Sequence, residues 1–160
     1  MRATRSSLSI AVAWLLLGAP VIAAPASLFQ RMGGEPVLRD AVDRFTDIVM
    51  ADDRINFTFA ETDLGKFKTL LYEQLCDLSG GHCRYSGRDM ATAHAKLDIT
   101  TSEFNALAED LYIALHRVGV PYRLQNKLVA LLAPMKRDIV KRGRPVAPVN
   151  NAAGDSRRDQ

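Results

Sequence analysis

Apolar residues recur every three or four positions through most of the chain, which is the repeat of an amphipathic α-helix. No stretch keeps the alternation of apolar and polar residues that a half-buried β-strand requires. The first stripe consists of Val37, Ala41, Phe45 and Val49. Pro36 stands in the first turn of that helix, where no backbone N–H donor is needed. The pattern therefore predicts an all-α protein.

A second long helix is predicted from Asp63, a good N-cap residue, to the glycines Gly80 and Gly81. Its apolar stripe consists of Phe67, Leu71, Leu75 and Leu78. A short helix is expected around Leu28, and residues 82–88 are expected to form a loop. The two glycines allow the chain to leave the helix and change direction.

The third helix is predicted to start at the capping box Thr100–Glu103, and the fourth opens at Pro121. Pro134 should kink the fourth helix or force a local adjustment. The expected inward residues are Phe104, Leu107, Leu111, Leu115 and Val118, then Leu124, Leu128, Leu131, Met135 and Ile139. Four such helices fit either a plain bundle or a globin, and periodicity alone does not choose between them.

The N-terminal segment, residues 1–24, has the order of a secretory signal peptide: Arg2 and Arg5, an apolar run, then small residues. An uncleaved membrane anchor is the alternative, although the run is short for a span of about 20 residues. The candidate cleavage sites are Ala23, Ala24 and Ala26. We therefore expect export, to a bacterial periplasm, with no stable membrane insertion after processing.

The C-terminal segment, residues 143–160, is polar and includes Pro145 and Pro148, so a disordered tail is expected. The predicted folded domain is residues 25–142. The formal net charge of the 160-residue chain is +3, and two of its positive charges lie in the predicted signal peptide. No basic stripe is interleaved with aromatic residues, so nucleic acid is not an expected partner.

One segment carries a pattern beyond helical periodicity, Tyr-x-Gly-x-x-Met-x-x-x-His-x-x-x-x-Ile-Thr, from Tyr85 to Thr100. It resembles the proximal segment of the group I truncated haemoglobins, the two-over-two globins. Further matches to that family follow one another in order along the chain. They are Ser27 to Gly34, Val42 to Phe45, Ala51 to Asn56, Phe59, Gly119 to Pro121 and Leu132 to Pro134.

The resemblance implies a globin-like two-over-two helical sandwich enclosing haem b. The helices at Pro36 and Asp63 would stack across those at Thr101 and Pro121. The resemblance also implies that His94, on a short helical turn, is the ligand of the haem iron. Of the other histidines, His82 belongs to the loop and His116 falls off a buried stripe, so neither is the expected ligand.

The resemblance also implies which residues surround the haem. Phe59 matches a phenylalanine wedged against the haem face, with ordinary core packing as the alternative. Met90 is expected to line the pocket beside His94, and Lys68 and Arg88 could reach the haem propionates or simply be solvated. The expected cofactor-binding residues are Phe45, Thr46, Phe59, Phe67, Lys68, Leu71, Leu75, Arg88 and Met90.

The distal side of the pocket, opposite His94, departs from the family pattern. Group I proteins typically have tyrosine where this chain has Thr46, and glutamine at one or both of the positions of Phe67 and Leu71. Without those donors, dioxygen loses hydrogen bonds worth roughly 1 to 3 kcal/mol in a dry pocket. The short Thr46 hydroxyl can bond its own helix instead. Tyr72 and Gln74 are predicted to lie off the Phe67 stripe.

The expected function is that of an exported haem protein that binds the diatomic gases O2, NO and CO, with dioxygen held least firmly. The alternative is a haem-dependent nitric oxide dioxygenase or another redox enzyme, and an unidentified reductase is a candidate partner. A haem-free globin scaffold that binds a partner protein is a third hypothesis.

The only two cysteines, Cys76 and Cys83, flank Gly80 and Gly81. A chain reversal at the glycines can bring their Cα atoms within the range of about 4.4 to 6.8 Å that a disulfide requires. In an exported protein a disulfide is favoured, and in a cytosolic protein two reduced thiols would be. We expect the disulfide, with reduced thiols as the alternative.

Overall fold

The computed structural model describes residues 25–141, so the predicted signal peptide and polar tail lie outside the described residues. Within that range the chain forms α-helices and two short 3₁₀ helices, and no strand. No helix in the described range is long and apolar enough to cross a bilayer. The α-helices are α1 (Leu28–Met32), α2 (Gly34–Ala51), α3 (Leu64–Leu78), α4 (Met90–His94), α5 (Thr101–Arg117), α6 (Tyr122–Leu132) and α7 (Lys136–Ile139), and the 3₁₀ helices are η1 (Asn56–Phe59) and η2 (Ala133–Met135).

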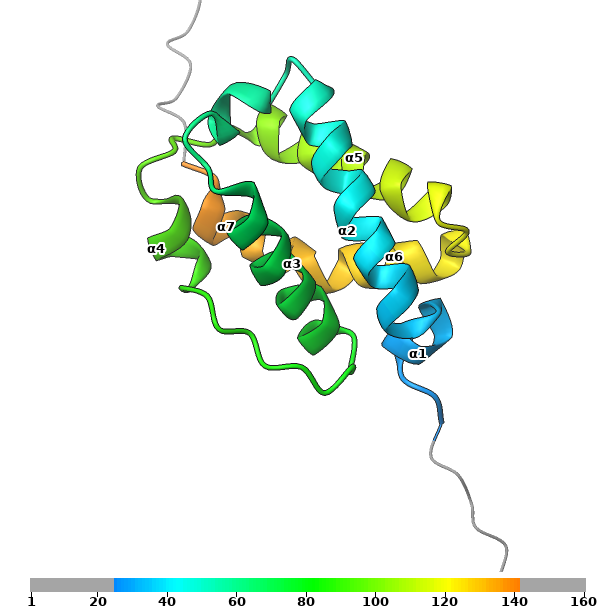
Figure 1. The fold of residues 1–160 in the computed structure, drawn as a ribbon. Coiled ribbons are helices and arrows are strands. Elements are labelled where there is room, and N and C mark those ends of the chain that lie inside the picture. The colour runs from blue at the N-terminus through cyan, green and yellow to red at the C-terminus, as the bar shows by residue number, and fades with distance from the viewer. Residues whose placement is uncertain (1–24, 142–160) are drawn as a thin grey trace, which may run out of the picture.

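The long helices form two layers that cross each other. In Figure 1, α2 and α3 lie in front, while α5, α6 and α7 pass behind them. α2 packs against both α3 and α5, and α3 also contacts α6. The short helix α4 lies at one edge and packs against α7. This arrangement confirms the predicted all-α, two-over-two sandwich.

Side-chain caps start the helices at the predicted positions. The Asp63 carboxylate accepts the Lys66 backbone N–H at 3.0 Å at the start of α3. At the start of α5, the Thr100 hydroxyl accepts the Glu103 N–H at 3.2 Å, and the Glu103 carboxylate accepts the Thr100 N–H at 2.8 Å. Such a cap typically stabilises a helix by about 1 kcal/mol. Asp89 caps α4 in the same way, by accepting the Thr92 N–H.

The hydrophobic core lies between the two layers. On α2 its buried members are Leu38, Ala41, Val42, Phe45 and Val49. Facing elements contribute Leu75 of α3, Leu111, Ala114 and Leu115 of α5, and Leu124 and Leu128 of α6. Burying each leucine fully contributes about 1.5 to 3 kcal/mol. The apolar stripes read from the sequence therefore hold the layers together.

Pro134 divides the predicted fourth helix into α6, η2 and α7. Proline lacks a backbone N–H and its ring clashes with the preceding helical turn, so this is the local adjustment that was predicted. The prediction that Leu131 faces inward is wrong, because Leu131 is 39 % exposed. Leu132 is half-buried instead. It lies one full turn after the buried Leu128, so it continues the same helix face.

An ionic cluster joins the turn after α2 to α5. The Arg54 guanidinium pairs with Asp52 at 2.8 Å and with Glu109 at 2.7 Å, and lies 4.0 Å from Asp110. Asp110 is buried, and its Oδ2 has no hydrogen-bond partner in the described part of the chain. Burial, with the nearby Asp52 carboxylate adding to it, raises the pKa of Asp110 to about 6.

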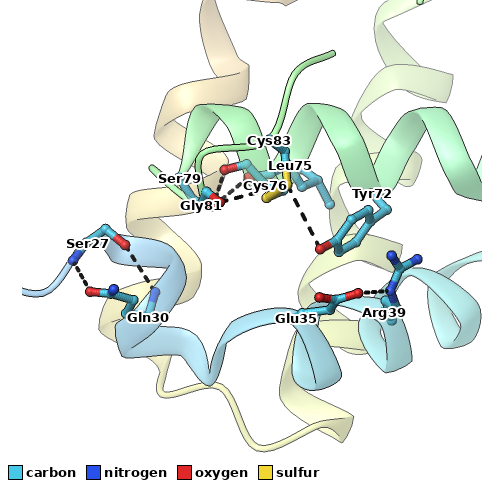
Figure 2. The surroundings of a disulfide bond; sticks show 10 residues. All are labelled: Ser27, Gln30, Glu35, Arg39, Tyr72, Leu75, Cys76, Ser79, Gly81 and Cys83. Carbon is cyan, nitrogen blue, oxygen red and sulfur yellow. Dashed lines mark hydrogen bonds and ion pairs between the residues drawn. A yellow bond between two sulfur atoms is a disulfide. The ribbon is translucent and has the colours of Figure 1, made fainter. Parts of the chain in front are cut away.

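A disulfide joins Cys76, in the last turn of α3, to Cys83 in the following loop, as predicted. Their Cα atoms are 5.7 Å apart. The chain turns at Gly80, whose φ is +81°, and the Gly81 N–H donates to the Cys76 carbonyl at 2.8 Å. Figure 2 shows the bridge beside Tyr72. The disulfide thus ties the end of α3 to the loop that leads to α4.

Candidate functional site

His94 is the last residue of α4, and its side chain is half-buried. Its Nδ1 lies 2.8 Å from the carbonyl oxygen of Met90. A carbonyl oxygen only accepts hydrogen bonds, so a neutral His94 carries its proton on Nδ1 and keeps the lone pair of Nε2 free. His94 is therefore held in the tautomer that a metal ligand needs.

A cavity of about 150 Å³ lies beside His94, between the end of α4 and the end of α7 with the two residues that follow it. It is lined by His94, Ala95, Asp98, Asp138, Ile139, Val140 and Lys141. The Lys141 ammonium pairs with the Asp98 carboxylate at this cavity. His82 and His116 are exposed and do not line it. Among the three histidines, the geometry favours His94 as a ligand.

Three of the expected cofactor-binding residues form an aromatic cluster. The rings of Phe45 and Phe67 are stacked with their centroids 6.4 Å apart. The ring of Phe59 meets that of Phe67 edge to face, with centroids 5.2 Å apart. These side chains come from α2, η1 and α3, and edge-to-face packing holds aromatic rings in defined orientations. The fold therefore places Phe59 beside the inner face of α3, and its contact with haem remains a prediction.

The inner face of α3 continues from Phe67 through Leu71, both half-buried, to the fully buried Leu75. Thr46 of α2 is also buried, and its hydroxyl donates to the Val42 carbonyl at 2.8 Å. The Thr46 hydroxyl is thus committed to its own helix, as the sequence analysis allowed. This part of the site is apolar.

The prediction that Gln74 lies off the inner face of α3 is wrong. Gln74 is half-buried, and its Nε2 lies 3.4 Å from the sulfur of Met90 and 3.5 Å from that of Met135. Three and seven residues separate Gln74 from Leu71 and Phe67, and both spacings return to the same helix face. That spacing was the signal that could have found it.

Tyr72, in contrast, points away from this face, as predicted. Its ring is buried toward α2, where the Arg39 guanidinium lies 4.0 Å from the ring centroid. Figure 2 shows Tyr72 between Arg39 and the disulfide. Tyr72 therefore offers no hydroxyl to the inner face of α3.

Lys68 and Arg88, which were expected to reach haem propionates or to be solvated, have other surroundings in the structure. The Lys68 ammonium pairs with the Asp43 carboxylate at 2.9 Å. Arg88 is exposed, and its carbonyl oxygen accepts the Tyr85 hydroxyl at 2.8 Å. Neither side chain lines the cavity beside His94. Their contact with a cofactor remains a prediction.

Comparison with known proteins assigns the same range of the chain to a single family. Residues 27–141 match the family model of the bacterial-like globins. A group 1 truncated haemoglobin from a Synechocystis species is 36 % identical over 71 % of this chain and 97 % of its own length. A group 1 truncated haemoglobin from Chlamydomonas moewusii is 30 % identical over 92 % of this chain and 87 % of its own length.

Solved structures agree with these relatives. The Fe(III) form of a truncated haemoglobin from Tetrahymena pyriformis superposes with a TM-score of 0.70 at 27 % identity, covering 72 % of this chain and 98 % of that one. A two-over-two haemoglobin from a Synechococcus species, in the cyanomet state with covalently attached haem, gives 0.68 at 31 % identity over the same shares. The chain belongs to the bacterial-like globin family and is a group 1 truncated haemoglobin.

Proposed function

We propose that His94 holds the iron of haem b through Nε2, so that this truncated haemoglobin binds diatomic gases as its family does. Binding of haem and of such gases is the function of the family to which the chain belongs. The observation that carries the role of His94 is the hydrogen bond between Nδ1 and the Met90 carbonyl. Metal-bound histidines almost always donate their other ring N–H to such an acceptor, which fixes the ring and makes the ligand more basic.

Several side chains of the helical sandwich offer apolar surface to a flat cofactor. Phe59, Phe67, Leu71, Met90 and Ile139 are apolar, yet remain half-buried within the helical sandwich. A porphyrin placed among them would remove their exposed apolar surface from water, which stabilises both partners. When bound, the haem supplies an iron with an open coordination position for a gas, while the protein supplies the histidine and a pocket of low polarity.

The distal side supports binding of carbon monoxide and nitric oxide more than stable retention of dioxygen. The Thr46 hydroxyl proton is used within α2, and Phe67 and Leu71 carry no donor. The Gln74 amide, on the same face of α3, is turned to the sulfurs of Met90 and Met135. Retention of dioxygen depends most on donated hydrogen bonds, because polarity at this face decides how a bound gas is stabilised. Nitric oxide dioxygenation requires retained dioxygen, so the apolar distal face disfavours it.

The test is an optical spectrum of the ferrous protein and of a His94→Ala variant. The unmodified protein should hold a five-coordinate ferrous haem that binds carbon monoxide, and His94→Ala should lose the haem or hold it weakly. His116→Ala is the matched control, because His116 is exposed on α5. Spectra and haem content like those of the unmodified protein in His94→Ala would overturn the assignment.

We also propose that the protein is exported and that the mature chain begins near Pro25. The proposal is supported by the sequence pattern of residues 1–24, and the disulfide of Cys76 and Cys83 fits an oxidising compartment. Intact-mass measurement of the protein from the cell-envelope fraction of its native host tests it. A chain that retains Met1 to Ala23 in the membrane fraction would contradict it.

A further inference from the structure

Gln74 is a polar residue on an otherwise apolar helix face. The inner face of α3 also carries Phe67, Leu71, Leu75 and Leu78. The amide of Gln74 reaches from this face to two other elements, α4 at Met90 and η2 at Met135. It thereby links the layer of α3 to the segment that bears His94.

The two atoms that accept hydrogen bonds from the Gln74 amide are unusual acceptors. Both are thioether sulfurs, at 3.4 and 3.5 Å from Nε2, and a thioether accepts hydrogen bonds only weakly. Gln74 is half-buried, so only part of its amide is withdrawn from water. Two such weak hydrogen bonds add little to the stability of the core, so the effect of this amide lies in where it holds the two methionines.

Met90 is the more informative of the two contacts, because it contacts both Gln74 and His94. Its side-chain sulfur accepts from Gln74, while its backbone carbonyl accepts from Nδ1 of His94. Met90 opens α4, a helix of five residues. Helices this short have little stability of their own, so tertiary contacts must determine their orientation.

We propose that Gln74 is a positioning residue for His94, acting through Met90. By holding the Met90 side chain, the Gln74 amide fixes the rotation of α4 about its axis. That rotation sets the direction of the Met90 carbonyl and hence the plane of the His94 imidazole. The inference rests on the proposed role of His94 as haem ligand.

The consequence concerns the bond between His94 and iron rather than the gas itself. Groups that orient a metal-bound histidine control its ring orientation and its basicity. Without the Gln74 amide, the first turn of α4 would be held less firmly and the imidazole would occupy a wider range of orientations. The iron–histidine stretching band should then shift or broaden, and haem should leave faster.

The experiment compares Gln74→Leu, Met90→Leu and the double variant with the unmodified protein. Gln74→Leu removes the donor, while Met90→Leu removes the sulfur but keeps the backbone carbonyl. Two readouts are taken: the iron–histidine band in resonance Raman spectra of the ferrous protein, and the rate of haem transfer to an excess of an apoglobin acceptor. Thr69→Val is the control, since Thr69 is exposed on α3.

Each single variant should shift or broaden the band and speed haem transfer by roughly threefold to tenfold, the effect of one modest hydrogen bond. The double variant should be no faster than the singles, because both remove the same contact. Thr69→Val should leave both readouts unchanged. Where Gln74→Leu fails to fold, Gln74→Met, which keeps the length of the side chain but has no N–H donor, takes its place.

The two proposals fail in different ways. If the unmodified ferrous protein shows no iron–histidine band and His94→Ala keeps its haem, the proposed function fails before Gln74 is considered. If that band is present and both single variants leave it and the haem-transfer rate unchanged, the positioning role of Gln74 is overturned. Additive effects in the double variant would likewise overturn the route through Met90.

Discussion

The hydroxyl of Thr46 shows how one local contact decides what a residue can offer to a bound gas. Thr46 is buried on α2, next in sequence to Phe45, whose ring packs on that of Phe67. The Thr46 proton goes to the Val42 carbonyl one turn earlier. A threonine hydroxyl in a helix can donate to this carbonyl in a preferred rotamer, so the hydroxyl proton is used within the helix. The distal face consequently keeps its apolar character.

Thr46→Tyr should restore a donor to the distal face and slow the release of dioxygen by roughly tenfold, the equivalent of about 1.4 kcal/mol from one hydrogen bond. The measurement is the dioxygen dissociation rate by stopped-flow spectroscopy. Thr46→Phe is the control, because it adds the ring without the hydroxyl. Equal slowing in both variants would show that the ring, and not a hydrogen bond, is responsible. Very slow release from the unmodified protein would point to another donor, such as the Gln74 amide on the same face of α3.

Asp110 gives a prediction about pH. Its pKa is about 6 in the folded protein against an ordinary value of 3.8, so the folded state binds the proton more tightly than the unfolded state. The contribution of Asp110 to the unfolding free energy is therefore fully present below about pH 4. It is lost as the pH rises through 6. The loss amounts to roughly 1 to 3 kcal/mol.

Asp110→Asn should remove this pH dependence, because the amide does not ionise. The difference in unfolding free energy, Asp110→Asn minus unmodified protein, should rise between pH 4.5 and pH 7.5 in urea titrations. Glu109→Gln is the control: Glu109 is exposed and contacts the same Arg54. A difference that stays constant with pH would show that Asp110 does not titrate in this range.

At the scale of elements, the segment between α3 and α5 is the least regular part of the sandwich. It holds only the five-residue α4 between the loop after Gly81 and the start of α5. The Asp89 cap, the packing of α4 on α7 and the disulfide hold this segment. Because α4 carries His94, each of these contacts bears on the position of the proposed ligand.

Reduction of the disulfide should destabilise the protein by roughly 2.5 kcal/mol, the chain-entropy value for so short a loop. The comparison is urea unfolding with and without dithiothreitol. Cys83→Ala is the matched variant, since Cys83 is only half-buried and its loss leaves Cys76 in place. This variant should resemble the reduced protein and should not respond to dithiothreitol. Two thiols that alkylate freely in unreduced, denatured protein would contradict the disulfide.

At the scale of the whole molecule, haem should act as part of the core. Apolar side chains between the layers are left half-buried by the polypeptide alone, and a cofactor that binds only the folded state stabilises that state by mass action. Removing haem should lower the unfolding free energy, by about 4 kcal/mol where free haem exceeds its dissociation constant a thousandfold. Circular dichroism during urea titration of the protein with and without haem measures this. Coinciding transitions would show that haem does not bind between the layers.

The amino-acid sequence by itself determined the number and type of the long helices, their starts at Asp63 and Thr100, and the break at Pro134. These features depend on neighbours within a few residues: the helical repeat of apolar side chains, a capping oxygen three residues from its donor, and a proline without an N–H. The disulfide could also be predicted from the sequence, since its cysteines are only seven residues apart. The family motif around His94 is likewise local.

Only the tertiary structure decided which of the remaining side chains face the site. The prediction for Leu131 is wrong because a helical stripe defines a face but not which neighbouring helix will cover its borders. The helix face of Gln74 follows from its spacing to Leu71 and Phe67, but its contacts do not. The partners of Gln74 come from positions 16 and 61 residues away. The raised pKa of Asp110 likewise needs burial beneath a cluster from another element. Packing between distant segments sets these contacts and this pKa, and the local pattern of residues does not show which distant segments will pack together.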